Sequence, residues 1–212
     1  MHKLIIFDMD GVLTKAGSSW VAVHDHFGVN NEAALKLYLE HKIDDMEFMR
    51  RDIALWKAKK PNLCKKDIQA ILGKVEFNPN LEYLFKEIRK RGLRAAVVSG
   101  GIDVLAQRLQ RSIKCDYVAA NGLLYEETGL VTGEGVLRVP VMNKDLVVKE
   151  VQRMFKMARA DTISVGNSLV DAQLFKESDL GIAFNPEDDV VRKAAQVIIE
   201  SDDLAMIVEY LD

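Results

Sequence analysis

The chain has 212 residues, of which 49% are hydrophobic, and a formal net charge of −3. A chain of this length buries one sizeable core, or one core and a small inserted domain. The charge gives no electrostatic reason to expect a nucleic-acid partner.

Three features of the sequence concern the compartment. The N-terminus leads directly into a predicted strand, without the basic segment and long apolar run of a signal peptide. No stretch of about 20 apolar residues predicts a membrane span. Cys64 and Cys115 are far apart and in no CxxC pattern, which favours free thiols but leaves a disulfide open. We therefore predict a cytoplasmic protein with no membrane partner, and the sequence leaves a homodimer open.

The first predicted element is a strand over residues 4–7, because the run LIIF is typical of a strand buried on both faces. The residues that follow, DMDG, permit two interpretations. An Asp-Gly pair between apolar runs is typical of a hairpin turn, in which Asp8 and Asp10 would be ordinary turn residues. In the other interpretation, the two aspartates form a catalytic pair at the carboxyl end of the first strand of an α/β sheet.

Residues 16–76 show a helical pattern throughout. Helices are predicted over residues 20–28, 31–41, 44–59 and 65–72. Pro61 separates the last two, and no strand-like run appears among them. The pattern predicts a helical cap domain over residues 16–76, inserted into a core domain formed by residues 1–15 and 77–212.

Strands and helices alternate after residue 78. Strands are predicted over residues 95–99, 162–166, 180–184 and 196–200, and helices over residues 80–91, 144–157, 169–176 and 188–194, with one more that follows Gly101 and ends near Arg111. Residues 117–136 are predicted as extended segments with turns at Asn121-Gly122 and Thr128-Gly129. The alternation predicts an α/β fold with a doubly wound parallel sheet and helices on both faces.

Ligands of open α/β sheets bind at the carboxyl ends of the strands. The residues at that edge with chemistry suited to phosphate or metal are Asp8, Asp10, Ser99, Gly100, Gly101, Lys144, Asn167, Ser168 and Asp171. Each has an ordinary explanation by itself, such as a loop, a surface lysine or a helix cap. Their coincidence at one edge favours a functional site over the hairpin turn.

Four segments of the chain resemble the four motifs of the haloacid dehalogenase (HAD) superfamily of phosphohydrolases, and within it the phosphoserine phosphatase branch. They are FDMDGVLT, VVSGG, Lys144 within NKDLVVKE, and VGNSLVDAQLF. The resemblance covers almost the whole chain, including a helical cap and the segment AANGLLYEETGLVTGE, which is similar to that family's extended hairpin. It implies a Rossmann-like core with an inserted α-helical cap and a small β-hairpin. It also implies Mg²⁺-dependent hydrolysis of a small phosphate ester.

The resemblance assigns roles to individual residues. Asp8 matches the nucleophile that forms an aspartyl-phosphate, and Asp10 matches the general acid and base. Ser99, Gly100 and Lys144 match the residues that bind the substrate phosphate by a hydroxyl, by an amide that opens a helix, and by a fixed charge.

The resemblance also implies a magnesium site, and Mg²⁺ takes oxygen ligands in proteins. Its ligands would be the Asp8 carboxylate, the Asp10 backbone carbonyl and Asn167, with Asp171 as either a direct ligand or a supporting neighbour. The family's fourth motif usually begins with an aspartate where this chain has Asn167. An amide brings no charge, so we expect weaker metal binding.

The cap differs from the phosphoserine phosphatase pattern at one position and matches it loosely at others. Gly17 stands where that branch carries an acid that pairs with the serine ammonium group. Arg50 and Arg51 resemble the region of its carboxylate-binding arginine, although a solvent-facing position is an equal alternative. Trp20 and Phe48 are candidates for the substrate pocket or, alternatively, for the core of the cap.

Two histidines of the cap, His24 and His26, lie two positions apart on a predicted helix and so face different directions. We interpret them as ordinary surface or cap residues. Two other functions stay open: a phosphotransferase that uses the same intermediate, and a non-catalytic binding module that has lost its metal.

Overall fold

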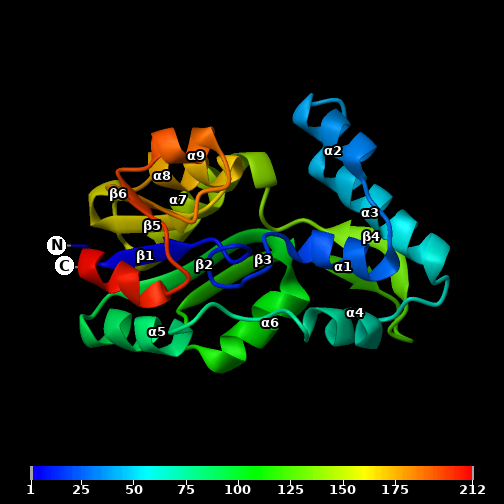
Figure 1. Ribbon diagram of the computed structural model, residues 1–212, viewed down its shortest axis with the longest axis horizontal. Coiled ribbons are helices and arrows are strands. Elements are labelled where there is room, and N and C mark those ends of the chain that lie inside the picture. The colour runs from blue at the N-terminus through cyan, green and yellow to red at the C-terminus, as the bar shows by residue number, and fades with distance from the viewer. Residues whose placement is uncertain (1, 212) are drawn as a thin grey trace.

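The structure is a computed structural model and describes residues 2–211. A seven-stranded sheet forms the centre of the molecule (Figure 1). The strands lie in the order β4-β3-β2-β1-β5-β6-β7. Their bounds are β1 Leu4–Phe7, β2 Arg94–Ile102, β3 Tyr117–Tyr125, β4 Val131–Val136, β5 Thr162–Gly166, β6 Leu180–Phe184 and β7 Val197–Ile199. Neighbouring strands are parallel except for the antiparallel pair β3 and β4. The predicted α/β fold is confirmed.

Helices cover both faces of this sheet. One face carries α7 (Lys144–Phe155), α8 (Ala172–Lys176) and α9 (Asp189–Ala194), and the other carries α5 (Leu81–Lys90) and α6 (Asp103–Ser112) with a 3₁₀ segment, Leu204–Tyr210 (Figure 1). Shorter 3₁₀ segments lie at Val141–Asn143, Arg159–Asp161 and Leu169–Asp171. None of the helices within residues 2–211 is long and apolar enough to cross a membrane.

Strand β1 lies between β2 and β5 and is buried on both faces. Ile5 and Phe7 point into the core under α5 and α6, whereas Leu4 and Ile6 point into the core under α7 and α8. Successive side chains of a strand face opposite ways, so both faces need apolar residues. This explains the continuous run LIIF and fixes the position of the residue that follows it, Asp8.

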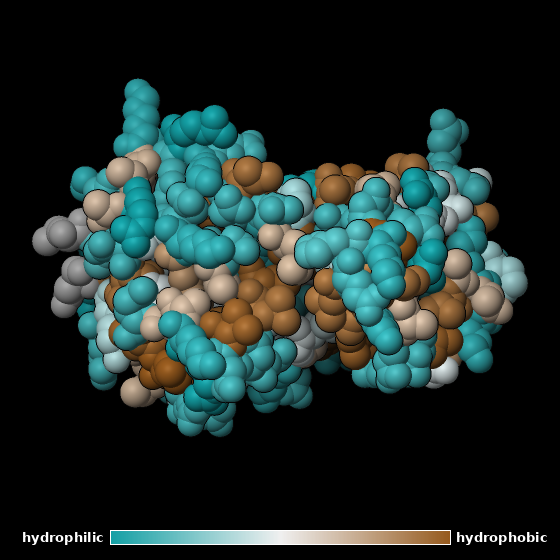
Figure 2. All heavy atoms as spheres, turned by 90° about the horizontal axis from the view of Figure 1, so that it is seen from above, coloured by the Kyte–Doolittle hydropathy of each residue, from teal (hydrophilic) through white to brown (hydrophobic). Residues whose placement is uncertain are grey.

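Four helices follow β1 and precede α5. They are α1 Ser19–Phe27, α2 Glu32–Leu39, α3 Asp45–Lys59 and α4 Lys65–Leu72. Helix α1 packs on α3 and α4, α3 also covers β4, and α4 packs on α6. We call this group of helices the cap. Seen from above, the molecule has two lobes with a narrower waist, one lobe built on the sheet and the other on the cap (Figure 2).

Two connections between the sheet and the cap run side by side. The amide of Lys15 donates to the carbonyl oxygen of Glu76 at 2.9 Å, and the amide of Asn78 donates to that of Leu13 at 3.0 Å. These hydrogen bonds pair the two connections in antiparallel orientation at the predicted boundaries of the cap. The division into two domains stays a prediction, because the apolar core continues from the sheet into α1 and α4.

Two local predictions were wrong, because a strand continues through residues that were expected to end it. Gly100 and Gly101 belong to β2, which continues to Ile102, so they do not open helix α6. Asn121 and Gly122 lie inside β3 rather than in a turn. The side chain of Asn121 is buried and holds the loop before α7, accepting hydrogen bonds from the amides of Arg138 and Val139.

Two further local outcomes concern a turn and the cysteines. The predicted turn at Thr128-Gly129 is confirmed, and Gly129 has a φ of 84°, in the region that favours glycine. Cys64 and Cys115 are both free thiols, so the disulfide alternative is excluded.

Replacing Ile5 in the central strand by alanine should destabilise the protein strongly. Its side chain is fully buried, so Ile5→Ala removes apolar contacts and leaves a cavity, at a cost of about 2–5 kcal/mol in the free energy of unfolding. The matched control is Leu146→Ala on the exposed side of α7, which should change that free energy by about 0.5 kcal/mol or less. Urea denaturation measures both, and equal effects would contradict this account of the core.

Candidate active site

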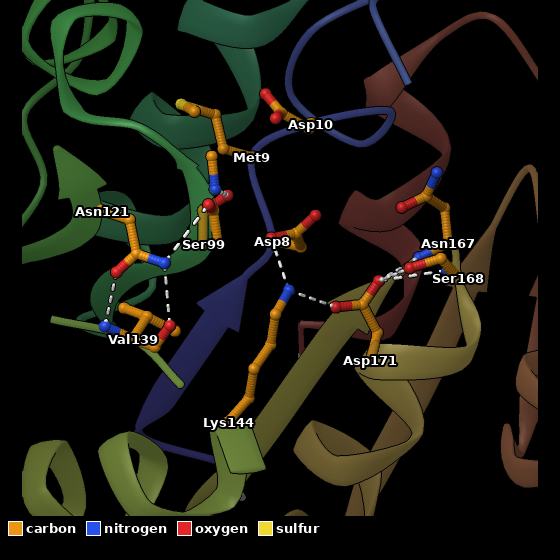
Figure 3. A network of polar contacts seen from close by, with 12 residues as sticks. Asp8, Met9, Asp10, Ser99, Asn121, Val139, Lys144, Asn167, Ser168 and Asp171 are labelled. Atoms are coloured by element: carbon orange, nitrogen blue, oxygen red, sulfur yellow. Dashed lines mark hydrogen bonds and ion pairs between the residues drawn. The ribbon is translucent and has the colours of Figure 1, made fainter. Parts of the chain in front are cut away.

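A buried lysine joins two carboxylates at the carboxyl edge of the sheet (Figure 3). The Lys144 Nζ lies 2.8 Å from Asp8 Oδ1 and 2.7 Å from Asp171 Oδ1. Asp8 follows β1, Lys144 begins α7, and Asp171 ends the 3₁₀ turn after β5. The three residues are 5%, 2% and 0% exposed. The structure therefore brings together three residues that the strand pattern assigned to one edge.

Asp171 has both carboxylate oxygens occupied. Oδ1 binds Lys144, while Oδ2 accepts hydrogen bonds from the amides of Asn167 and Ser168, each at 3.0 Å, and from Ser168 Oγ at 3.1 Å. Oδ2 therefore has three donors, and Oδ1 faces the lysine. Of the two roles that the resemblance left open for Asp171, these contacts favour the supporting role.

The cap orients the second aspartate of the DMDG segment. Asp10 Oδ2 accepts hydrogen bonds from the amide and the hydroxyl of Ser19, the first residue of α1, both at 2.7 Å. The Ser19 hydroxyl oxygen in turn accepts from the amide of Ile102 at 2.8 Å. The other oxygen of Asp10, Oδ1, is buried without a hydrogen-bond partner in the described chain. Ser19 was missed by the sequence analysis, and its place in the helix start SSW was the available signal.

Gly101 lies against this contact. A Cβ atom there would come within 2.5 Å of Asp10 Oδ2 and 2.7 Å of Ser19 Oγ. A side chain at this position would displace the aspartate, so the close approach explains the glycine.

Burial shifts the protonation of the site. Burial raises the pKa of Asp8 to about 7, although the charge of Lys144 opposes the shift. Burial also raises the pKa of Asp10, against the two hydrogen bonds from Ser19. For Lys144, burial lowers the pKa, but Asp171 and Asp8 outweigh this effect and raise it, so the amine stays charged. A carboxyl group with a raised pKa is suited to donate a proton.

The phosphate-binding candidates from β2 lie beside the aspartates. Ser99 is buried and accepts a hydrogen bond from the amide of Gly101 at 3.1 Å, which leaves the proton of its hydroxyl group available to a ligand. The carbonyl oxygen of Gly100 accepts from Trp20 Nε1 at 3.0 Å. The strand thus presents Ser99 to the site and uses Gly100 to hold the cap.

A cavity of about 300 Å³ opens over these residues and continues into the cap. Its sheet end includes Asp8, Asp10, Ser99, Gly100, Lys144 and Asn167, and its cap end includes Trp20, His24, Asn31, Asp45, Phe48 and Asp52. Trp20 stacks on Trp56 with ring centroids 5.5 Å apart. Trp20 and Phe48 were candidates for the substrate pocket or for the core of the cap. Both residues line the cavity.

Arg50 and Arg51 do not line the cavity. Arg50 Nε binds Glu134 of β4 at 2.7 Å, Arg51 Nε binds Glu47 at 2.8 Å, and both side chains are more than 40% exposed. On α3, residues 48, 49 and 52 share the face toward the cavity, and helical geometry turns the two intervening residues away. The alternative of a solvent-facing position fits both arginines.

His24 is a buried residue of the cap, one of the two alternatives that the sequence analysis gave. It is 3% exposed, lines the cavity and accepts a hydrogen bond from Trp56 Nε1 at its Nδ1 atom, 2.8 Å away. It is therefore not an ordinary surface residue. The signal was its spacing, because residue 24 shares a helix face with Trp20, one turn earlier.

Glu187 is also absent from the predicted site residues, all of which precede β6. It lies in the loop after β6 and lines the cavity. Its Oε1 accepts a hydrogen bond from Asn167 Nδ2 at 3.0 Å, and its amide donates to the Asn167 carbonyl oxygen at 2.8 Å. A carboxylate thus stands beside the amide that replaces the family's motif-four aspartate. Burial raises the pKa of Glu187.

The oxygen atoms at the sheet end suit a hard metal ion. In Figure 3 the amide oxygen of Asn167 faces Asp8 and Asp10, and its nitrogen is the atom held by Glu187. The second carboxylate oxygen of Asp8 and Oδ1 of Asp10 have no hydrogen-bond donor within residues 2–211. Oxygen donors of this kind fit Mg²⁺. No group of three or more His, Cys, Asp and Glu side chains in that range could hold an ion alone, so amide, backbone or water oxygens would complete the set.

The model of the haloacid dehalogenase-like hydrolases matches residues 5–176 of this chain. The chain belongs to this family. Its curated relatives include the phosphoserine phosphatase of Methanocaldococcus jannaschii, 28% identical over 99% of this chain and 97% of that protein. The phosphoserine phosphatase of Wolinella succinogenes is 26% identical over 99% of this chain and all of that protein.

Solved structures of this hydrolase family agree with the sequence match. A substrate-bound phosphoserine phosphatase aligns with a TM-score of 0.85 and 26% identity, covering 100% of this chain and 99% of that one. A phosphoserine phosphatase that holds an analogue of the phospho-aspartyl intermediate aligns equally well, at 27% identity and with the same coverage. The predictions of a haloacid dehalogenase fold and of a phosphatase of this type are confirmed.

Replacing Lys144 by methionine should destabilise the protein because it leaves Asp8 and Asp171 buried without a countercharge. We expect Lys144→Met to lower the free energy of unfolding by about 3–5 kcal/mol at neutral pH. Lys149→Met on the same helix removes only exposed ion pairs with Asp145 and Glu177 and should cost about 1 kcal/mol or less. Chemical denaturation compares the two, and a Lys144 variant as stable as the control would contradict the prediction.

Proposed function

We propose that this protein hydrolyses a phosphate monoester of a small alcohol through an aspartyl-phosphate on Asp8, with Mg²⁺ as cofactor. The observation that carries the proposal is the buried Lys144 bridge to Asp8, with Asp10 beside it at one end of the cavity. This arrangement provides a nucleophile, a proton donor and a fixed positive charge around one point. These are the three groups that phosphoryl transfer to a carboxylate requires.

In the first step, a carboxylate oxygen of Asp8 attacks phosphorus. The new bond joins that oxygen to phosphorus, and the bond from phosphorus to the alcohol oxygen breaks. Asp10 donates its proton to the departing alkoxide, and burial, which raises the pKa of Asp10, favours the protonated form. Lys144 and the Ser99 hydroxyl stabilise the charge on the transferred group.

In the second step, Asp10 acts as the base. Its carboxylate takes a proton from a water molecule, whose oxygen attacks phosphorus while the bond to Asp8 breaks. Inorganic phosphate leaves and Asp8 is regenerated. The Asp8 carboxylate, the Asp10 backbone carbonyl and Asn167 would hold the metal, which when bound would neutralise negative charge on the phosphate.

The catalytic aspartates can be tested by single substitutions. Asp8→Asn should abolish phosphate release, because an amide cannot act as the nucleophile. Asp10→Asn should lower the rate by about 10²–10⁴, the usual contribution of general acid–base catalysis. Both are measured as phosphate release from a panel of esters with Mg²⁺, and mass spectrometry of acid-quenched enzyme should find the phosphoryl group on Asp8. Asp202→Asn, at an exposed position outside the cavity, is the control.

The same assay separates the alternatives. If the parent protein released no phosphate from any ester at saturating Mg²⁺, the hydrolase proposal would be wrong and a binding module would take its place. Phosphorylated alcohols formed at the expense of phosphate, when an acceptor alcohol is added, would instead indicate a phosphotransferase.

The metal site can be tested through Asn167 and its neighbour Glu187. Asn167→Asp alone would place two carboxylates about 3 Å apart, whereas Asn167→Asp combined with Glu187→Gln keeps a hydrogen bond and adds charge at the metal. We expect the double variant to bind Mg²⁺ roughly tenfold more tightly than the parent, because charge at a ligand position raises affinity. Calorimetry with Mg²⁺ alone measures this, with Glu187→Gln as the control. Equal or weaker binding by the double variant would contradict the assignment of Asn167.

A further inference from the structure

The cap end of the cavity is acidic. Asp52 on α3 is 1% exposed, and its Oδ1 accepts a hydrogen bond from Asn31 Nδ2 at 2.5 Å. Asp45 lines the same region, and its Oδ1 accepts from the hydroxyl of Tyr38 at 2.8 Å and from the amide of Val141 at 3.1 Å. Within residues 2–211, the Oδ2 atom of each aspartate receives no hydrogen bond. Two carboxylates therefore present oxygen atoms to the cavity.

His24 supplies an unpartnered polar atom at the same place. A tryptophan Nε1 only donates, so the Nδ1 of His24 that accepts from Trp56 carries no proton and the ring proton lies on Nε2. This Nε2 is buried without a hydrogen-bond partner in the described chain, 3.5 Å from Asp52 Oδ1. With Nδ1 occupied as an acceptor, the imidazole is uncharged and does not neutralise Asp52.

No lysine or arginine neutralises the two acids. Within residues 2–211, neither Asp45 nor Asp52 forms an ion pair with either residue type. Lys144 is the one residue of either type that lines the cavity in this part of the chain, and it is bound to Asp8 and Asp171 at the other end. A buried carboxylate without a countercharge is costly, and a cation brought by a ligand would remove that cost.

The walls between the two ends are aromatic and aliphatic. Trp20 and Phe48 line the cavity together with Leu35 and Met49. The ring of Phe48 stacks on Tyr38 at 4.8 Å, and that of Trp20 stacks on Trp56, so both rings are held in place. Aromatic faces attract ammonium groups, and the apolar surface suits a short carbon chain. The acids and the rings thus favour the same chemical group.

We propose that the substrate is a phosphate monoester of an amino alcohol, with its ammonium group at the cap end near Asp52 and no carboxylate there. This inference rests on the proposed hydrolysis and adds its substrate class, with Asp52 as the residue that determines specificity. The named substrate of the relatives, phosphoserine, carries both an ammonium group and a carboxylate. Asp45 and Asp52 repel a carboxylate, and neither Arg50 nor Arg51 lines the cavity to bind one. We therefore expect phosphoserine to be a poorer substrate than the same ester without its carboxylate.

The test compares esters that differ by one group. 2-Aminoethyl phosphate has the ammonium group alone, O-phosphoserine adds a carboxylate, and ethyl phosphate has neither. The 3-aminopropyl and propyl phosphates repeat the comparison with a carbon chain that is one atom longer. We expect kcat/KM to be roughly 10- to 100-fold higher for an aminoalkyl phosphate than for its alkyl match, as a charge-assisted hydrogen bond provides. The kcat/KM for O-phosphoserine should be lower than that for 2-aminoethyl phosphate.

A substitution of Asp52 links the preference to this residue. Asp52→Asn keeps the shape of the side chain and an acceptor for Asn31 but removes the charge. The ratio between aminoalkyl and alkyl phosphates should fall to within about threefold of one, since the lost interaction is the charge-assisted one. Glu47→Gln on the same helix removes a carboxylate that lies outside the cavity and should leave the ratio unchanged.

Binding to the Asp8→Asn protein separates the two proposals. Calorimetry with the same esters on this variant should show tighter binding of the aminoalkyl phosphates whether or not the parent turns them over. Hydrolysis without any preference for the ammonium group, a preference for O-phosphoserine, or a ratio that survives Asp52→Asn would overturn the substrate class alone. Absence of hydrolysis with the binding preference intact would overturn the proposed function alone.

Discussion

The charge of Lys144, buried between Asp8 and Asp171, is the constraint on which the rest of the site depends. An ammonium group this deep is stable only with close partners, and each partner carboxylate in turn needs the lysine. The partners come from the ends of β1 and β5, which are neighbours in the sheet, and the lysine comes from the helix that covers them. The order of the strands and the crossover through α7 are thus what assemble the site, and any register change in β1 would dismantle it.

The cap is joined to the catalytic groups rather than merely lying over them. The hydroxyl of Ser19 on α1 donates a hydrogen bond to the Asp10 carboxylate and accepts one from the amide of Ile102. Trp20 Nε1 donates to the carbonyl oxygen of Gly100. These bonds connect the first turn of α1 to both β1 and β2. A movement of the cap would therefore change the environment of Asp10, the proposed general acid and base, at the same time as it opened the cavity. Substrate entry and proton transfer would then share one structural element.

The sequence predicts the sheet end of this site well and the cap end poorly, for a physical reason. Strand ends are fixed by local apolar runs, and parallel packing brings them to one edge, so Asp8, Ser99 and Asn167 are found without knowing any long-range contact. The cap residues depend on how each helix is rotated about its axis. Arg50 and Arg51 were candidates because of their charge. Asp52, the next residue on α3, lines the cavity, whereas the two arginines lie outside it. The two wrong predictions in β2 and β3 also depend on a long-range contact, because Ile102 pairs with Asn121 after an irregularity in β2 that contains Gly100 and Gly101.

The two ends of the cavity differ in how their acids are compensated, and this difference orients a substrate. At the sheet end, Lys144 and the oxygen atoms suited to a metal give a place where the negative phosphate is stabilised. At the cap end, Asp45 and Asp52 are without a cation among the described residues. A molecule with a phosphate at one end and an ammonium group at the other matches this distribution in one direction only. The charges that bind the proposed substrate would also bring its phosphorus atom to Asp8, so that recognition by the cap would contribute to the alignment that the attack requires.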